Sequence, residues 1–263
     1  MICGGVDAGS RTIKAVLWDS RPGVVLGSGL VDQGVQQSRL ARELFDRVRA
    51  QAGLDGRPVG PIVATGYARH TVDFAATTIT EITCHAAGVH HLLGEARTVV
   101  EIGGQDSKLL RLGERGTVRD FAMNDRCAAG TGRFLEAVAA RLGVGMEALG
   151  ELACASHSPA TISSMCVVFA ETEIIGLLAG GTLPADIVAG VQNAIATRVA
   201  AMAGQGLDAP VAFTGGVALV GGMPQAISQA LRMPVVVPPG PRMTGALGAA
   251  ILASRLATAP AAR

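Results

Sequence analysis

Short apolar runs separated by polar turns open the chain and predict a meander of three strands. The runs cover residues 2–7, 13–17 and 24–30. Apolar positions then recur at helical spacing between Ser38 and Gly53, which predicts a helix with Ser38 as its N-cap. A strand is predicted at 61–65, and a mostly helical segment follows at 77–93.

The second part of the chain opens with the same pattern. An apolar run closed by Glu101 turns through Gly103 and Gly104 and returns as a strand that carries Lys108. A third strand is predicted at 118–123. Two helices then follow cysteines directly: apolar-periodic stretches after Cys127 and Cys166 end at Gly143 and at Gly180–Gly181, respectively. A strand at 210–214 and a helix at 244–256 complete the predicted elements.

The two parts contain an internal repeat, because residues 6–14 align with residues 100–108 without a gap. The alignment places Asp7 on Glu101, Gly9 on Gly103 and Lys14 on Lys108. We therefore expect an α/β fold with duplicated βββαβα units in two lobes, 1–95 and 96–243, with a helix at about 244–263 returning to the first lobe. A single glycine hairpin would indicate an ordinary tight turn, whereas a matched pair favours a nucleotide held in the cleft between two lobes.

The residues of the two turns suit phosphate chemistry. Glycines let backbone N–H groups approach phosphate oxygens. Asp7 and Glu101 would repel phosphate, so we expect them to hold Mg²⁺ or its waters. Lys14 and Lys108 are candidate counter-charges, with a solvated strand end as the alternative. Further candidates for the nucleotide are Gly9, Ser10, Arg11, Thr12, Gly103 and Gly104, and the second turn adds Gln105 and Asp106 to the two acids as candidate catalytic residues.

Two further glycine motifs lie later in the chain. Gly215, Gly216 and Val217 follow a predicted strand, where an adenine or ribose would lie flat on the backbone; an ordinary strand-to-helix connection is the alternative. Gly245 and Gly248 indicate a helix face that permits close packing where the lobes hinge, although simple helix packing explains them nearly as well. The sequence contains neither a Walker loop nor a strand–GxGxxG–helix fingerprint.

Composition narrows the class of protein. The 263 residues are 49% apolar, 3% aromatic and carry a net charge of +1. We therefore expect a soluble enzyme that does not bind nucleic acid, because neither a basic face nor a set of stacking aromatics is present. No apolar stretch is long enough to span a membrane, and the first residues have no signal pattern, so we expect a cytoplasmic location.

The five cysteines do not suggest a disulfide framework, since their number is odd and their spacing is irregular. They are buried small residues, metal ligands or reactive thiols. Two of them precede predicted helices, where the helix dipole stabilises an anion by ~0.3–1 kcal/mol and favours thiolate. These two are Cys127 and Cys166.

Several motifs resemble known families over essentially the whole chain. The actin-like (ribonuclease H-like) ATPase and acetate/sugar kinase superfamily is suggested by DAGSRTIK, EIGGQDSK, TGGVA and TGALGAA. Within this superfamily, the chain closely resembles the ATP-dependent activators of 2-hydroxyacyl-CoA dehydratases, which are relatives of the ATPase subunits of benzoyl-CoA reductase. The motifs that carry this resemblance are MNDRCAAGTGRFLE, SSMCVVFAETE and ATGYARHTV.

The resemblance implies an ATPase that uses ATP and Mg²⁺ to drive a single electron into a dehydratase or related reductase, with ferredoxin or flavodoxin as donor. It also implies a homodimer with one 4Fe-4S cluster between its subunits, held by Cys127 and Cys166 of each. Counting ligands agrees, because a cubane needs four thiolates and one chain offers two at comparable helix starts. The competing arrangement uses four cysteines of one monomer, and spacing alone favours buried small residues.

Some positions depart from the family or stay ambiguous. Relatives often have a small residue at the place of Arg11, and Asp is also common at that of Glu101. Glu171 and Glu173 face either the nucleotide or the solvent, and Asn124 suits a cap better than chemistry. We expect structural roles for Cys3, Cys84, Cys154 and His85.

Functions of other kinds also stay open. The chain would serve a dehydratase, a benzoyl-CoA-type reductase or another low-potential reductase. From other classes, a small-molecule kinase of the same fold or an ATP-dependent scaffold is possible, but neither accounts for two cysteines at helix starts.

Overall fold

The computed structural model describes residues 1–163, 166–204 and 206–258, and the chain divides into two compact units. Unit 1 comprises Met1–Glu95, Gly113–Val118 and the described part of Arg242–Arg263. Unit 2 comprises Ala96–Leu112 and Arg119–Pro241. Each unit contains its own five-stranded sheet.

The sheet of unit 1 begins with the predicted meander. Its strands are β1 (Ile2–Ala8), β2 (Thr12–Asp19), β3 (Val24–Asp32), β4 (Ile62–Thr65) and β5 (Thr77–Thr78), in the order β3-β2-β1-β4-β5. β1 pairs with β2 in antiparallel and with β4 in parallel orientation. β1 is therefore the central strand, and almost all of it is buried.

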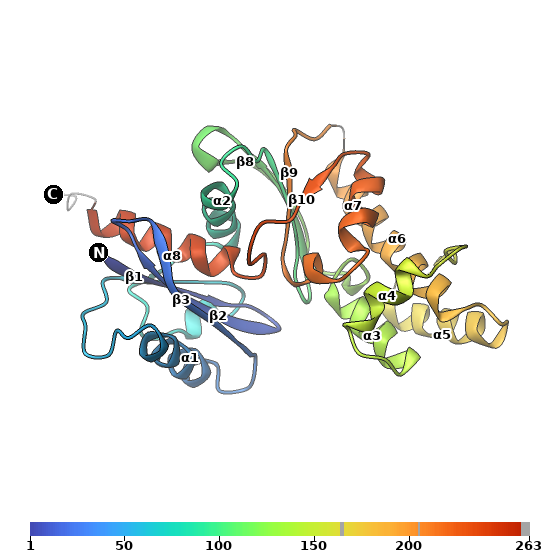
Figure 1. The fold of residues 1–263 in the computed structure, drawn as a ribbon, viewed down its shortest axis with the longest axis horizontal. Coiled ribbons are helices and arrows are strands. Elements are labelled where there is room, and N and C mark those ends of the chain that lie inside the picture. The colour runs from blue at the N-terminus through green and yellow to red at the C-terminus, as the bar shows by residue number, and fades with distance from the viewer. Residues whose placement is uncertain (164–165, 205, 259–263) are drawn as a thin grey trace. The chain divides into compact units, whose positions relative to one another are not determined.

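Helices cover both faces of this sheet (Figure 1). Helix α1 (Gln37–Gln51) buries Leu44, Phe45 and Val48 against one face. Helices α2 (Glu81–Leu92) and α8 (Thr244–Thr258) lie on the other. The expected N-cap at Ser38 is wrong, because α1 begins at Gln37. The side chains of Arg42 and, to a smaller extent, Ser38 hydrogen-bond to Asp73 instead and hold the pKa of that carboxyl low.

The segment at 77–93 is mostly helical, as expected, and β5 and Thr80 precede α2. Thr80 caps this helix by accepting a hydrogen bond from the N–H group of Thr83 (3.4 Å). Short 3-10 turns lie at Arg69–Thr71 and Glu114–Gly116.

Glycines let α2, α8 and β1 approach one another closely. A Cβ at Gly248 would overlap the carbonyl group of Cys84, and one at Gly88 would overlap that of Thr244. A Cβ at Gly5 would likewise meet the backbone of Ala246. The close packing expected for the helix that carries Gly248 is thus present within unit 1, between α8, α2 and the sheet.

The sheet of unit 2 repeats the strand order of unit 1. Its strands are β6 (Thr98–Ile102), β7 (Ser107–Leu112), β8 (Val118–Asn124), β9 (Val211–Thr214) and β10 (Val235–Val236), in the order β10-β9-β6-β7-β8. The meander strand β6 pairs antiparallel with β7 and parallel with β9, as β1 does with β2 and β4. The duplication expected from the sequence is therefore confirmed at the level of strand order.

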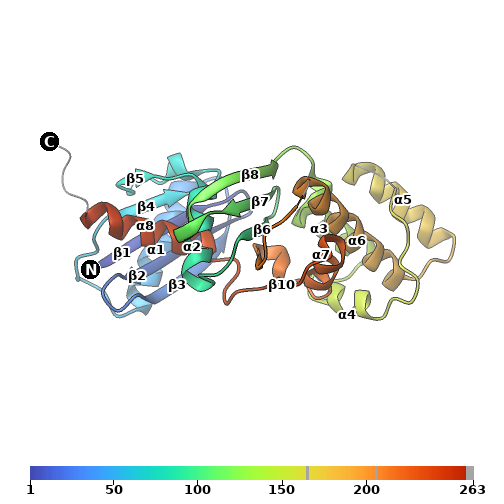
Figure 2. The ribbon, with the colours of Figure 1, turned by 90° about the horizontal axis from the view of Figure 1, so that it is seen from above.

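Among the described residues of unit 2, five helices accompany this sheet (Figure 2). They are α3 (Gly132–Leu142), α4 (Ala148–Cys154), α5 (Val167–Ala179), α6 (Pro184–Ala203) and α7 (Met223–Leu231). Their apolar side chains form one core with the sheet, which includes Phe134, Val191 and Phe213. Among the described residues, no helix combines the length and the apolar character that a membrane crossing requires.

Candidate functional site

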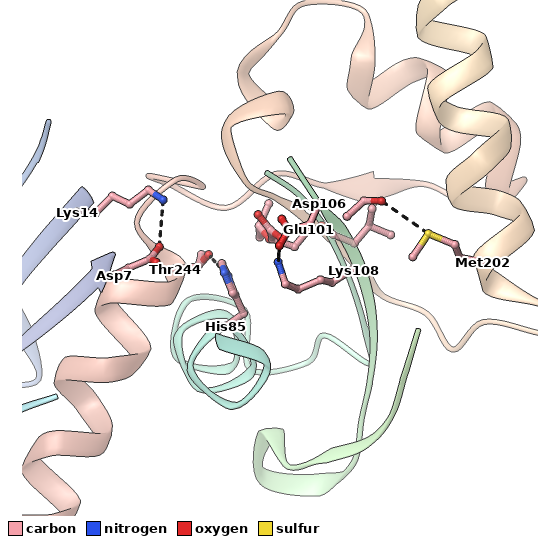
Figure 3. Close-up of polar contacts among 11 residues, drawn as sticks. Asp7, Lys14, His85, Glu101, Asp106, Lys108, Met202 and Thr244 are labelled. Carbon is pink, nitrogen blue, oxygen red and sulfur yellow. Dashed lines mark hydrogen bonds and ion pairs between the residues drawn. The ribbon is translucent and has the colours of Figure 1, made fainter. Parts of the chain in front are cut away.

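The first acid–lysine hairpin lies in unit 1. Asp7 of β1 and Lys14 of β2 are direct cross-strand partners, and the distance from Lys14 Nζ to Asp7 Oδ2 is 3.1 Å (Figure 3). The N–H group of Gly9 donates to the carbonyl of Thr12 (3.1 Å), which closes the turn. At the tip, Ser10 is partly buried and Arg11 is exposed. The turn therefore presents backbone, a hydroxyl group and a cation beside the carboxylate.

Glycines surround the Asp7 carboxylate. A Cβ at Gly66 would lie 2.5 Å from Asp7 Oδ1, and one at Gly245 would lie 3.1 Å from Asp7 Oδ2. Gly66 also has a φ of +90°, a conformation that favours glycine. Because side chains are absent at both places, the backbone at Gly66 and Gly245 packs against this carboxylate more closely than a Cβ would allow.

The second hairpin lies in unit 2 and is more deeply buried. Lys108 Nζ lies 3.0 Å from Glu101 Oε2, its cross-strand partner, and 2.8 Å from Asp106 Oδ2 (Figure 3). The Lys108 side chain is 1% exposed, so the alternative of a solvated strand end is wrong. The turn is closed by a hydrogen bond from the N–H group of Gly103 to the carbonyl of Asp106 (3.0 Å), and Gln105 is exposed at its tip.

The structural repeat extends beyond the hairpins. The strand register pairs Asp7 with Thr65 and Glu101 with Thr214, and a glycine of nearly equal φ follows each threonine. Gly66 has a φ of +90° and Gly215 a φ of +89°. A Cβ at Gly215 would lie 2.8 Å from Glu101 Oε1. Sequence reasoning missed Gly66, although the Thr-Gly pair after a strand was the available signal.

The motif at 215–217 forms a strand-to-3-10 connection. Gly215 donates its N–H to the carbonyl of Pro241 (3.0 Å), and the 3-10 turn Gly216–Leu219 follows. Gly216 is exposed, whereas Val217 is 3% exposed and packs in the core of unit 2. The structure thus offers the backbone of Gly216, more than the side chain of Val217, to a ligand.

Cys127 does not begin the long helix that the sequence predicts. It precedes a 3-10 turn, Ala128–Gly130, and α3 starts only at Gly132, with Thr131 as its N-cap. Thr131 has extended backbone (φ −136°, ψ 174°), and its hydroxyl accepts from the N–H group of Arg133 (3.3 Å). The dipole of α3 therefore acts at Thr131, and the expected dipole effect on Cys127 is wrong for this helix.

Hydrogen bonds instead position Cys127. The Asn124 side chain accepts from the N–H group of Cys127 (3.1 Å) and donates to its carbonyl (2.8 Å). Downstream, the N–H groups of Gly132 and Arg133 donate to the carbonyls of Gly103 and Gly104, both at 2.9 Å. The segment from Cys127 to α3 is thereby attached to the second glycine turn.

Cys166 lies directly before α5, as expected, and is exposed. The two acids that follow it have structural partners. Glu173 accepts from the N–H and hydroxyl groups of Ser163 (2.8 and 2.7 Å), and Glu171 forms an ion pair with Arg141 of α3. The remaining positions of the cysteine motif, 164 and 165, lie outside the described residues.

The other cysteines differ from this pair. Cys3 and Cys84 are fully buried, and desolvation raises the pKa of Cys84 to about 12. Cys154 is exposed at the end of α4. Within residues 1–163, 166–204 and 206–258, no three His, Cys, Asp or Glu side chains gather closely enough to hold a metal ion.

Two sheets of equal strand order, each with an acid–glycine–lysine hairpin on its central strands, define an ATPase of the actin-like fold. Residues 5–253 match the BadF/BadG/BcrA/BcrD ATPase family, and the chain belongs to this family. It is 41% identical to the activator of lactoyl-CoA dehydratase from Anaerotignum propionicum, over 95% of this chain and 96% of the relative.

Two solved structures are similar over nearly their whole length. The (R)-2-hydroxyglutaryl-CoA dehydratase component A from Acidaminococcus fermentans has a TM-score of 0.92 at 35% identity and covers 98% of this chain and 100% of its own. The activator of 2-hydroxyisocaproyl-CoA dehydratase from Clostridium difficile, with bound ADPNP, has a TM-score of 0.90 at 34% identity and covers both chains fully.

Proposed function

We propose that this protein is an ATP-hydrolysing iron–sulfur activator that passes single electrons to a 2-hydroxyacyl-CoA dehydratase. The observation that carries the proposal is the hydrogen-bonded attachment of the Cys127 segment to the second glycine turn, through Gly132 and Arg133. It joins a phosphate-type turn to a thiol within one unit. The similarity to dehydratase activators supports the same conclusion.

ATP and Mg²⁺ would be held by the two hairpins and their glycines. The Asp7 carboxylate would supply the kind of oxygen ligand that Mg²⁺ takes, beside the glycine turn of the same hairpin. Lys14 retains partial exposure and is the better phosphate counter-charge, whereas Lys108 is buried between two acids. Gln105, exposed at the second tip, is suited to orient a water, and the exposed backbone of Gly216, after buried Gly215, is suited to contact the nucleoside. The similar C. difficile structure contains bound ADPNP, which supports a nucleotide here.

The cysteines fit a cluster shared between two subunits. Cys127 is partly buried and Cys166 is exposed, while Cys3 and Cys84 are packed in the core of unit 1. Using four cysteines of one chain would require unpacking that core. Two ligands from each of two copies complete a 4Fe-4S site, which when bound supplies a one-electron carrier of low potential. Val168 and Phe169 in the first turn of α5, each 70% exposed, give the second copy an apolar surface to cover.

The chain can pass a change at the nucleotide to the thiols through three described contacts. Movement of the Gly103–Gly104 turn would pull the first N–H groups of α3. The Arg141–Glu171 ion pair connects α3 to α5, which follows Cys166. Asn124 holds the backbone of Cys127 during such a movement. Nucleotide state would thus reach both thiols through hydrogen bonds and one ion pair.

We extend the proposal to the partners implied by the resemblance. Ferredoxin or flavodoxin would reduce the homodimer in the cytoplasm, and a dehydratase would receive the electron. A benzoyl-CoA-type reductase is the alternative acceptor, and mixing the reduced protein with each candidate partner distinguishes the two.

The decisive experiment is anaerobic purification followed by iron and sulfide analysis, an optical spectrum and light scattering, with and without ATP. We expect a brown dimer with about four irons per dimer, as a bridging cubane requires. Cys127→Ser should remove the iron while the thermal midpoint and circular dichroism stay unchanged.

Cys154→Ser is the matched control, because Cys154 is exposed, as Cys166 is, but lies at the end of helix α4 and does not precede a helix. It should keep the iron. A colourless monomer after anaerobic reconstitution would contradict the proposal and leave the small-molecule kinase to be tested with sugars and acids.

A further inference from the structure

Unit 1 contains a pocket of about 380 Å³ beside helix α1. The helix contributes Arg42, Phe45, Asp46 and Arg49, which are spaced three and four residues apart and therefore share one helix face. The segment 56–59 closes the opposite side. The volume lies within the range of small-molecule sites, about 300–1,000 Å³.

Strand β4 separates this pocket from the first hairpin. The strand begins at the pocket with Ile62 and ends at Thr65, the register partner of Asp7. At about 3.3 Å per residue, the two ends are about 10 Å apart. The pocket is therefore a different place on unit 1 from the Asp7 carboxylate.

One wall of the pocket is apolar and partly aromatic. Phe45 is 4% exposed, and its ring centroid lies 5.6 Å from that of Phe74 at an angle of 52°. Val59 and Ile62 also line the pocket and pack against the core of unit 1. A planar apolar group can pack against these side chains.

Two arginines on the rim can bind an anion. Arg49 donates from Nε to the carbonyl of Leu54 (3.1 Å) and from Nη2 to the carbonyl of Arg57 (3.2 Å). These bonds fix the guanidinium group and leave its other N–H groups available. The Arg57 side chain is exposed, and within the described part of the chain it has no hydrogen-bond or ion-pair partner.

The charges at the pocket leave a small positive excess. Arg42 lies over the Phe74 ring (4.6 Å to the centroid) and forms an ion pair with Asp73 (2.9 Å). Asp46 is the carboxylate among the lining residues. Three arginines thus face two carboxylates, which leaves one positive charge. This excess matches a carboxylate better than a phosphate ester, which carries about −1.5 to −2 at pH 7.

We propose that this pocket binds a small carboxylate attached to a planar apolar group. The carboxylate accepts hydrogen bonds from Arg49 and Arg57, because a guanidinium group donates paired N–H groups to such an anion. The planar group packs against Phe45 and Phe74, with Arg42 covering the outer face of Phe74. The proposal does not depend on the ATPase function.

The test is an NMR titration of the full-length protein with benzoate, followed through the backbone amide signals. We expect the signals of residues 56–59 to shift. Benzamide, which lacks the charge, and acetate, which lacks the ring, should each bind at least about tenfold more weakly. Arg57→Met should weaken benzoate about tenfold and leave the thermal midpoint unchanged, because this side chain is exposed.

Arg47→Met is the matched control, since Arg47 is also exposed and lies on α1 but outside the pocket lining. It should bind benzoate as the wild type does. Equal losses in Arg47→Met and Arg57→Met would indicate attraction to bulk charge and overturn the proposal. Signals of 56–59 that do not move would also overturn it, and tighter binding of phenyl phosphate than of benzoate would overturn the choice of a carboxylate.

Lys14→Met locates the probe, because Lys14 belongs to the first hairpin and not to the pocket. This variant should keep its affinity for benzoate. A loss in Lys14→Met that Arg57→Met does not show would place benzoate at the hairpin and overturn the proposal. None of these outcomes bears on iron content or ATP hydrolysis, which test the proposed function separately.

Discussion

The two acid–lysine hairpins share their register but differ in how the lysine is surrounded. Lys14 has one carboxylate partner, and its side chain is 15% exposed, whereas Lys108 lies between two carboxylates and is 1% exposed. The second carboxylate comes from one of the aligned positions that differ, where Thr12 in the first turn corresponds to Asp106 in the second. A duplicated element has thus kept its backbone while the electrostatic role of its lysine has changed.

The carbonyls of the two turns also have different partners. The carbonyl of Gly9 accepts from the side chain of Gln33 (2.8 Å), whereas that of Gly103 accepts from the backbone N–H of Gly132 at the start of α3. A side-chain donor can break its hydrogen bond without disturbing secondary structure, whereas a backbone N–H group at a helix start moves together with its helix. We conclude that the first turn is suited to receive a ligand and the second to transmit a change.

The largest expected effect comes from Lys108→Met. This change leaves Glu101 buried without its cation, which should lower the free energy of unfolding by about 3 kcal/mol or more. Lys14→Met, at the matched position, should cost about 1 kcal/mol, because water reaches that pair. Urea unfolding of both variants measures the difference.

The two variants should rank in the opposite order when their affinity for nucleotide is compared. Lys14→Met is expected to weaken ADP binding more than Lys108→Met does, as isothermal titration can show. Equal losses of stability in the two variants would remove the distinction between the hairpins.

A smaller effect is expected from Gly132→Ala. The new Cβ would lie 3.0 Å from the carbonyl oxygen of Gly103 and 3.3 Å from Val217 Cγ2. The turn or the helix must shift, at a cost of about 1–3 kcal/mol in unfolding free energy. The same variant should weaken ADP binding, because the second turn moves.

Gly176→Ala in α5 is the control, since no atom lies within 4 Å of its Cβ position. It should stabilise the protein by about 0.5–1 kcal/mol through helix propensity. If Gly132→Ala behaved like Gly176→Ala, the second turn would not be tightly coupled to α3.

The smallest effect is expected from Gln33→Ala, which removes the donor to the Gly9 carbonyl. A partly buried hydrogen bond of this kind contributes about 0.5–1.5 kcal/mol. Thr131→Ala, which removes the cap of α3, should cost about 1 kcal/mol. We expect only Thr131→Ala to increase alkylation of Cys127 in the iron-free protein, measured by mass spectrometry.

Local patterns predicted the parts of the fold that depend on neighbouring residues. The Asp7–Lys14 and Glu101–Lys108 register follows from tight turns between short strands, since turn length determines which residues face each other. The start of α3 was misplaced because Cys127 was chosen over Thr131, although threonine is the better N-cap.

The remaining features depend on contacts between distant parts of the chain. His85 and Thr244, whose side chains form a hydrogen bond (2.9 Å), are 159 residues apart, and Gly66 meets Asp7 only through the parallel pairing of β1 with β4. The spacing of hydrophobic residues along the chain does not indicate contacts between residues so far apart in the sequence. The sequence therefore indicates which residues face each other across a turn, but not which glycines lie against a carboxylate. The roles assigned to these residues stay predictions until the variants are measured.

Helix α8 joins unit 1 from the far side of unit 2 in the sequence. During translation, β1 therefore lacks the helix that covers it until residues 96–241 have been synthesised. At typical elongation rates this synthesis takes on the order of 10 s. Cys3 and Cys84, which pack beside Ala249 and Ala253 of α8, stay uncovered during that interval. Nascent chains should thus react with iodoacetamide at both thiols until α8 emerges and covers them.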